Sequence, residues 1–208
     1  LSYLMNAHRL EFETSGVLLL AKSKPVLVAL ADLFGSEKPL KNYVALVQGA
    51  PAEETFEVDA PLGMHPQRVG VMRVDRQGGK KSKTRFAVLE RFQGYTLLSC
   101  EPRTGRTHQL RVHLQSVRLP IAGDATYGGR PLLLSRLKSD YHLKTGRTER
   151  PLIATVALHA EGLTLNHPVT GQRLEITAPW PKDLTVAVKY LRRYALPATP
   201  SAPAVEGK

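Results

Sequence analysis

The sequence predicts an α+β domain built on a mostly antiparallel sheet. Several short apolar segments have the pattern of strands, and Gly or Pro residues separate most of them. Only a few segments have the apolar spacing that is typical of helices. A chain of 208 residues is long enough to bury a core without metal or disulfides. Many strands and few helices in one such domain favour the α+β class.

The predicted strands follow one another along most of the chain. Residues 17–21, Val-Leu-Leu-Leu-Ala, form a continuous apolar run and are predicted to be a buried strand. In residues 41–47, Tyr43 shares one face with Ala45 and Val47, as the alternation of a strand requires. The same criteria predict further strands at residues 56–58, 69–74, 84–91, 95–101 and 173–177.

Three segments are predicted to be helices. Residues 24–34 gather apolar side chains on one face, and Ser23 is a suitable N-cap for them. Residues 108–116 carry leucines on one side of a helix, and residues 182–191 form the candidate last helix.

Two segments lack such patterns. Residues 130–151 are rich in Arg, Lys, Ser and Thr and are predicted to form an exposed loop. Residues 196–208 contain several prolines and are predicted to be a disordered tail. The folded domain is therefore expected to span residues 1–195.

Charge and composition restrict the classes of function. Lys and Arg total 29 against 18 Asp and Glu, and the resulting net charge of +11 favours a polyanionic partner. A basic protein without such a partner is an equally good interpretation of charge alone. The single cysteine, Cys100, excludes an intramolecular disulfide and suits a reducing compartment. No apolar run is long enough to cross a bilayer and no signal peptide is recognisable, so no membrane partner is expected.

Three segments concentrate polar and special residues. The first, His-Arg-Leu-Glu-Phe-Glu-Thr-Ser-Gly at residues 8–16, sets Arg9 and Glu11 beside a turn that precedes a predicted strand. Such a turn can present a carboxylate at a sheet edge, although a solvated polar loop is the commoner structure. The second, Lys-Asn-Tyr-Val-Ala-Leu-Val-Gln-Gly at residues 41–49, carries Tyr43, which alone would be interpreted as a core tyrosine.

The third segment is the densest in charge. It is Arg-Thr-Gly-Arg-Thr-His-Gln-Leu-Arg-Val-His at residues 103–113, followed by Pro-Ile-Ala-Gly-Asp-Ala-Thr-Tyr-Gly at residues 120–128. Its arginines, Arg106 and Arg111 among them, are too concentrated for a plain surface helix. The turn before the helix offers free N–H groups to an anion, and an arginine there can hold a phosphate or pair with a buried carboxylate. Its two histidines, His108 and His113, lie well apart around a helix, so no metal site is expected.

Together these segments resemble the RluA-like branch of the pseudouridine synthases. That family carries a His-Arg-Leu-Asp…Thr-Ser-Gly motif, a Lys-x-Tyr strand, and a Thr-Gly-Arg-Thr-His-Gln-(Ile/Leu)-Arg-Val-His segment followed by Pro-Ile-x-Gly-Asp…Tyr-Gly. The chain has all three in order. Its Leu-His-Ala at residues 158–160 and His-Pro at residues 167–168 resemble the closing elements of the family. The likeness extends from about residue 8 to residue 181.

The resemblance implies a fold, a reaction and a partner. The fold would be a curved, mixed, mostly antiparallel sheet with flanking helices and a central cleft. The reaction would be the isomerisation of uridine to pseudouridine in structured RNA, either ribosomal or transfer RNA, without cofactor or metal. The target base cannot be reached inside a helix and would be flipped out. We also expect a monomer that acts in the cytoplasm.

The resemblance also implies roles for individual residues. Glu11 occupies the position of the catalytic aspartate, and Tyr43 that of the tyrosine that stacks on the target base. Arg111 matches the arginine that pairs with the catalytic carboxylate, and Arg9 and Arg106 match residues near the flipped nucleotide or its phosphates. The carboxylate would act as nucleophile at C1′ or as base at the 2′ position, and both alternatives stay open. Tyr43 is a candidate relay for the proton that must leave C5.

The chain departs from the family pattern at three places. Glu11 replaces the aspartate, and a site needs its geometry held to roughly 0.5 Å. Glu11 is therefore a natural variant with backbone compensation, a mark of RNA binding without catalysis, or an engineered change. Arg118 stands where a glycine often precedes the Leu-Pro step. The opening strand of the family and any S4 RNA-binding module are absent before residue 8, so a chain without its first strands is expected.

These departures leave two functions of different classes. The first is an RNA pseudouridine synthase. The second is a catalytically weak or inactive RNA-binding protein, or RNA chaperone, that uses the same cleft. The two differ in what Glu11 does.

Overall fold

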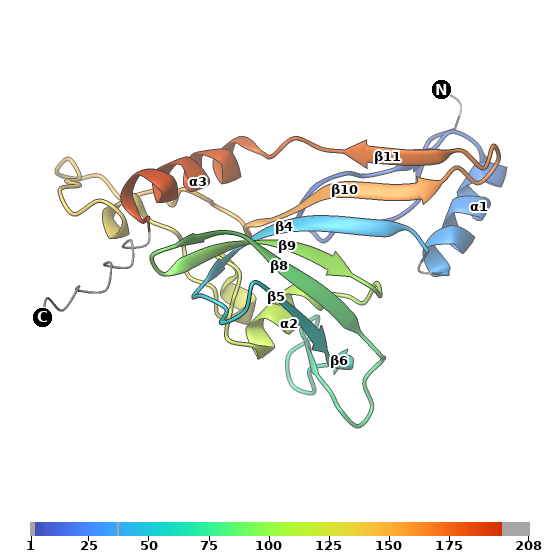
Figure 1. The fold of residues 1–208 in the computed structure, drawn as a ribbon, viewed down its shortest axis with the longest axis horizontal. Helices are drawn as coiled ribbons and strands as arrows, with labels where there is room; N and C mark the ends of the chain where they lie inside the picture. Colours follow the sequence, from blue (N-terminus) through green and yellow to red (C-terminus); the bar gives the residue numbers. More distant parts are fainter. Residues whose placement is uncertain (1–2, 37, 197–208) are drawn as a thin grey trace, which may run out of the picture.

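The structure, a computed structural model, describes residues 3–36 and 38–196. Its centre is a curved sheet in which neighbouring strands run antiparallel, and one short strand, β2 (Ser15–Gly16), joins it parallel to β10 (Figure 1). The predicted α+β class with a mixed, mostly antiparallel sheet is therefore confirmed. In order across the sheet, the other strands are β11 (Arg173–Thr177), β10 (Leu158–Asn166), β4 (Leu40–Gln48), β9 (Tyr95–Pro102), β8 (Lys83–Phe92) and β5 (Thr55–Asp59).

Helices flank this sheet, as predicted. Within the described residues they are α1 (Lys24–Gly35), α2 (Gln109–Ser116) and α3 (Lys182–Tyr194). Ser23 has extended backbone and lies at the N-cap position of α1, as predicted, but its side chain makes no capping hydrogen bond. A proline follows in the first turn, where its missing N–H costs nothing. In Figure 1, α1 and α3 lie near opposite ends of the sheet, and α2 lies below β9.

The main core lies around β4 and β9. Residues 44–47 of β4 are all fully buried, so both faces of this strand are covered. Leucines of α2 and α3, among them Leu114 and Leu191, belong to the same cluster. A strand packed in this way is a rigid support, and its first half carries Lys41 and Tyr43 toward the candidate site.

The prediction of a buried strand at residues 17–21 is wrong in part. The segment contains β3 (Leu20–Ala21), but residues 17–19 belong to no strand. The chain first pairs with β10 through β2 and then changes partner, because β3 pairs with β1 (Met5–Asn6). Leu18 and Leu20 are each 40% exposed, so the run is not buried throughout.

Three further differences concern strands. The strand predicted at residues 69–74 is confirmed only over β7 (Met72–Val74), which pairs with β6 (Leu62–Met64), a strand that was not predicted. β10 was not predicted either, because a bulge between His159 and Gly162 breaks the alternation of its side chains. The remaining predicted strands and the three helices are confirmed, with ends that differ by at most three residues.

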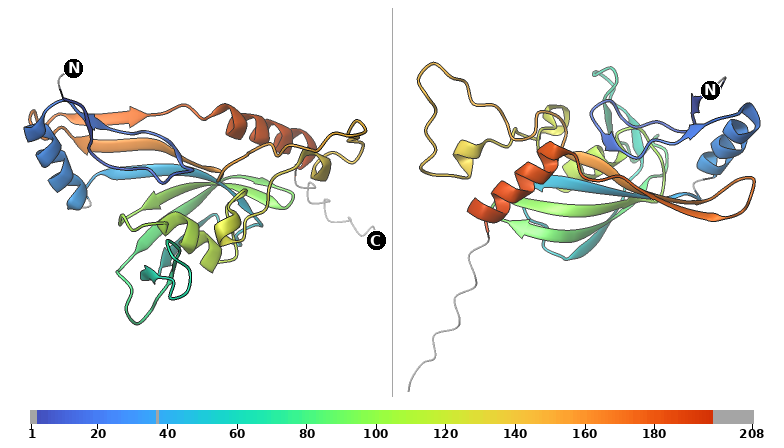
Figure 2. Two further views of the ribbon diagram at one scale, coloured as in Figure 1. Left: turned by 180° about the vertical axis from the view of Figure 1, so that it is seen from behind. Right: turned by 90° about the horizontal axis from the view of Figure 1, so that it is seen from above.

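Residues 130–151 form a loop that is largely exposed, as predicted, with one short 3-10 turn at Leu134–Arg136. Leu132 is the exception, since it is fully buried in the main core. Seen from above, this loop lies on the same side of the sheet as α2 and the N-terminal segment (Figure 2). Of the predicted tail, only Leu196 is among the described residues, so its disorder stays a prediction. In the part of the chain that the structure describes, the helices are too short or too polar to cross a membrane.

Candidate active site

The polar motifs of the sequence meet at one cavity beside α2. Its volume is about 190 Å³, below the roughly 300–1,000 Å³ of sites for drug-sized ligands, and it suits one small flat ring. Three stretches of chain form its walls: an N-terminal loop (residues 8–14), the first half of β4, and the turn that leads into α2. The lining residues are Arg9, Leu10, Glu11, Thr14, Lys41, Tyr43, Pro102, Thr104, Gly105, Arg106, Thr107, Gln109, Leu110 and Leu158.

The N-terminal loop is fixed at both ends. At its start, His8 Nε2 accepts a hydrogen bond from the backbone N–H of Leu19 at 3.0 Å, and burial lowers the pKa of His8. After its end, Ser15 Oγ and His159 Nδ1 form a hydrogen bond of 2.9 Å. Gly16 follows with φ 124°, and a Cβ there would overlap the backbone of β10. The Thr-Ser-Gly motif therefore docks the loop on the sheet.

Glu11 lies beside a buried ion-pair cluster. The Nε and Nη2 atoms of Arg111 donate to the two carboxylate oxygens of Asp124, each at 2.7 Å. The Nη1 atom of Arg111 donates to Oε2 of Glu11 at 3.4 Å. The side chains of Asp124, Arg111 and Glu11 are 0%, 8% and 24% exposed. The short, two-pronged pair is the stronger interaction, so Asp124 holds the guanidinium and directs its remaining N–H groups at Glu11.

The charge of Arg111 is permanent in this setting. Burial lowers the pKa of its guanidinium, but the hydrogen bonds and charge of Asp124, together with Glu11, outweigh burial and raise the pKa above its ordinary value. The guanidinium also lies over the ring of Tyr127, 4.9 Å from its centroid. The Arg111 guanidinium, which faces Glu11, is therefore held by the Asp124 carboxylate and by the Tyr127 ring.

Tyr127 is itself held by two groups. Its hydroxyl accepts a hydrogen bond from the backbone N–H of Met72 at 2.9 Å and lies 2.7 Å from Nδ1 of His108. His108 precedes α2 with φ 53°, a left-handed conformation that costs energy in a residue other than glycine. The bond to Tyr127 compensates for this strain and links the start of α2 to the Arg111 cluster.

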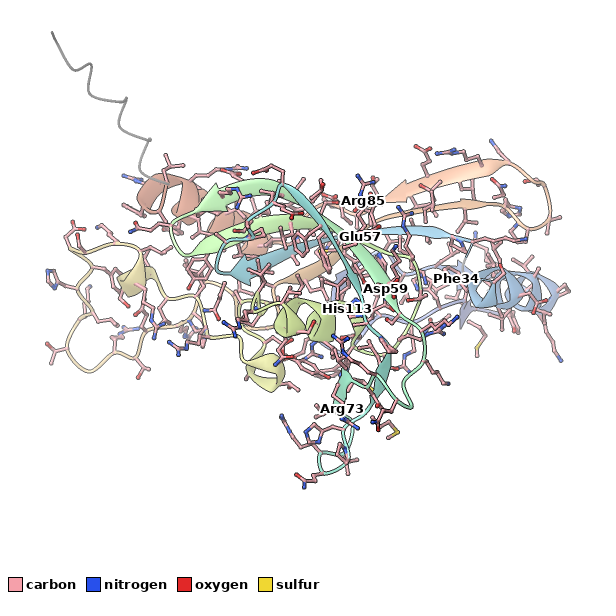
Figure 3. All side chains as sticks on the ribbon, turned by 60° about the horizontal axis from the view of Figure 1, so that its bottom comes forward. Phe34, Glu57, Asp59, Arg73, Arg85 and His113 are labelled. Atoms are coloured by element: carbon pink, nitrogen blue, oxygen red, sulfur yellow. The ribbon has the colours of Figure 1, made fainter. Side chains whose placement is uncertain are left out.

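The histidine within α2, His113, is also bound to protein groups. His113 is fully buried and forms hydrogen bonds with Thr84 Oγ1 at 2.9 Å and with the carbonyl of Ala60 at 3.0 Å. Figure 3 shows it close to Asp59 at the end of β5. Among the described residues, no group of three or more His, Cys, Asp or Glu side chains is arranged to hold a metal ion.

Tyr43 extends from β4 into the cavity wall that also carries Glu11. Burial disfavours the phenolate, and the charge of Glu11 adds to this, so the pKa of Tyr43 rises to about 12. Its hydroxyl is therefore protonated at neutral pH. Lys41 lies on the same face of β4 and adds a cation to the wall. A ring and a neutral hydroxyl beside a carboxylate suit the binding of a polar aromatic base.

Gln109 holds the turn that carries Arg106. Its Oε1 accepts hydrogen bonds from Thr104 Oγ1 at 2.8 Å and from the backbone N–H of Arg106 at 3.0 Å. Its Nε2 donates to the carbonyl of Lys83 and to Thr84 Oγ1, both at 3.0 Å. Since Gln109 is 3% exposed and bonded through both ends of its amide, it ties the turn rigidly to β8.

The site residues predicted from sequence come together in space. Four of them, Arg9, Glu11, Tyr43 and Arg106, lie on the cavity wall, and Arg111 lies behind Glu11. The main partner of Arg111 is Asp124, which was not predicted although it belongs to the motif at residues 120–128. Gln109 and Lys41 were also not predicted as site residues, although both belong to motifs that were singled out.

The sequence is similar to those of known proteins. A family model described as RNA pseudouridylate synthase matches residues 2–116. Ribosomal large subunit pseudouridine synthase C of Salmonella typhi is 39% identical over 195 residues, 93% of this chain and 58% of that protein. An RNA pseudouridine synthase of Bacillus subtilis is 36% identical over 186 residues, 89% of this chain and 55% of that protein. The chain thus spans little more than half the length of these relatives.

The fold has similar solved structures. One is human RNA pseudouridylate synthase domain containing 1, with a TM-score of 0.69 and 26% sequence identity. The match covers 95% of this chain and 83% of the human chain. The similarity therefore extends over nearly all of the fold.

Proposed function

The chain belongs to the RNA pseudouridylate synthase family, and from this membership we propose that it isomerises uridine to pseudouridine in RNA. One observation carries the proposal: a cavity of base size brings the Glu11 carboxylate and the Tyr43 ring together with the cations Arg9 and Arg106. This combination can bind a single base, act on its ribose and neutralise its phosphates. None of these steps requires a cofactor.

Each group suits one part of the reaction. The flipped uracil stacks on Tyr43, as bases do on aromatic side chains once they leave a helix. Glu11 acts at C1′ or at the 2′ position while the bond from C1′ to N1 breaks. Arg111, which Asp124 holds in place, orients that carboxylate. After C5 bonds to C1′, C5 loses its proton. The Tyr43 hydroxyl relays it by accepting this proton while it gives its own to the Glu11 carboxylate, which is free again at that stage.

We propose large-subunit ribosomal RNA as the substrate. Several relatives are named ribosomal large subunit pseudouridine synthases. The net charge of +11 supports sequence-independent attraction to the RNA backbone. Transfer RNA, a cytoplasmic location and a monomeric state stay predictions. Light scattering of the eluting protein on a sizing column checks the last of these.

The experiment uses large-subunit ribosomal RNA transcribed with 5-tritiated uridine, because C5 exchanges its hydrogen only when the isomerisation occurs. We expect the wild-type protein to release tritium and the Glu11→Gln variant to release none above background. Salt-dependent binding of the RNA without any release from the wild type would instead support the binding-only alternative. No finding favours that alternative, since the relatives are named as synthases.

A further inference from the structure

An exposed aromatic side chain lies next in sequence to a residue that lines the candidate cavity. Phe12 directly follows Glu11 and is 104% exposed. The backbone N–H of Thr14 donates to the carbonyl of Glu11 at 2.9 Å, which closes a tight turn with Phe12 and Glu13 at its tip. Glu11 and Thr14 both line the cavity, whereas Phe12 does not. The turn therefore presents the ring to solvent, beside residues that line the cavity.

The position of Phe12, rather than its exposure, is informative. Single exposed apolar residues are common on protein surfaces. Phe12, however, is held on a short turn whose two ends line the cavity, and its ring projects away from the rest of the chain. A phenylalanine ring gains most when a flat apolar surface covers it, since it can bury roughly 150–250 Å². A partner that enters this cavity would bring such a surface to the ring.

We propose that Phe12 stacks on the nucleobase next to the flipped uridine. The proposal rests on the function proposed above. When one base leaves a stack, its neighbour loses a stacking partner, and an aromatic side chain can stack in that place. Phe12 lies between Glu11 and Glu13 in the sequence. The carboxylates of these two residues repel phosphates. The tip therefore suits bases, whereas Arg9 and Arg106 suit the backbone.

The experiment compares variants of Phe12 in single-turnover tritium release from the same transcribed ribosomal RNA. Phe12→Ala is expected to lower kcat/KM by roughly five- to a hundredfold, the size of one lost stacking contact. Phe12→Trp should stay within about twofold of wild type, and Phe12→Leu should fall near Phe12→Ala, because stacking needs a π-face. Val169→Ala, at a 69% exposed position that does not line the cavity, should match wild type.

The outcomes separate this proposal from the proposed function. Release by Phe12→Ala equal to that of wild type would overturn the stacking contact and leave the function standing, as would full release by Phe12→Leu. If the wild type releases no label, the proposed function fails. Filter binding of the same RNA then tests the stacking contact by itself. Weaker binding by Phe12→Ala than by Val169→Ala then supports stacking, and equal binding refutes it. A tip that docks a protein would leave both release and RNA binding unchanged.

Discussion

The two sides of the candidate site are built in different ways. On the α2 side, Arg111, Asp124 and Gln109 are buried and bonded to several partners each. On the other side, the N-terminal loop carries Glu11 at 24% exposure, with an outward-pointing Phe12 beside it. The loop is fixed at its ends and across its turn. The carboxylate is thus positioned from behind by a rigid network, while the loop that carries it is the more exposed side of the site.

This difference has an energetic consequence. A buried polar group that loses its partner costs about 1–3 kcal/mol, and more when it is charged. An exposed side chain that loses a partner is solvated by water at little cost. Substitutions on the α2 side should therefore lower stability together with activity, whereas those on the loop side should change activity alone.

Asp124→Ala tests the first half of this contrast with the largest expected effect. The substitution leaves the guanidinium of Arg111 buried without its main partner, which typically costs about 3–5 kcal/mol. Urea unfolding followed by fluorescence measures the loss. The control is Glu175→Ala, which removes an ion pair with Arg173 of the same 2.7 Å length but with both side chains exposed. That variant should lose less than about 1 kcal/mol, and equal losses would refute the contrast.

Glu11→Asp tests the second half, on the loop side. The aspartate restores the side-chain length of the family motif, and about 1 Å of misplacement can cost roughly a hundredfold in rate. We expect tritium release to rise by up to that factor while the free energy of unfolding stays within about 0.5 kcal/mol. Equal or lower release would mean that the backbone of this chain already compensates for the longer glutamate.

His113 makes the α2 side sensitive to acid. Burial lowers its pKa, with the carbonyl of Ala60 and the charge of Asp59 opposing this in part. In the unfolded chain the histidine pKa is about 6.5. At and below this pH the unfolded chain therefore binds more protons than the folded one. Stability should therefore fall as the pH drops below about 6.5, by at most about 1.4 kcal/mol per pH unit from this group. His113→Gln should unfold more readily at pH 7.5 but show a flatter decline between about pH 6.5 and 5. An unchanged slope would exclude His113 as a source.

Arg118, just after α2, gives the smallest predicted effect and shows that this side also contains strain. Its φ is 62°, a left-handed conformation that glycine adopts without a steric cost. Arg118→Gly should raise stability by up to about 1 kcal/mol, or Tm by roughly 2–4 °C. Arg118→Ala is the matched control and should give no gain, because alanine keeps the Cβ. A gain in both variants would point to the charge of Arg118 instead of its backbone.

Local pattern was sufficient for much of the fold and for the location of the site. The helix at residues 24–34 and the strand at residues 41–47 could be predicted because apolar spacing and side-chain alternation act between near neighbours. Through their resemblance to the family, the motifs also predicted Arg9, Glu11, Tyr43, Arg106 and Arg111, which lie on or behind the cavity wall. The missing glycine at Arg118 corresponds to a positive φ. These features depend on residue type at a given position.

Only the tertiary structure decided how these parts meet. Arg111 lies 100 residues from Glu11 and 13 from Asp124, and the shorter bonds go to Asp124. The apolar run at residues 17–21 forms a strand only at its last two residues, because the chain leaves β10 after Gly16 and pairs with β1 from Leu20. The outward position of Phe12 likewise depends on a turn whose ends dock on other elements. Hydrogen-bond partners and burial depend on contacts between residues that are far apart in the sequence. A local sequence pattern does not specify such contacts.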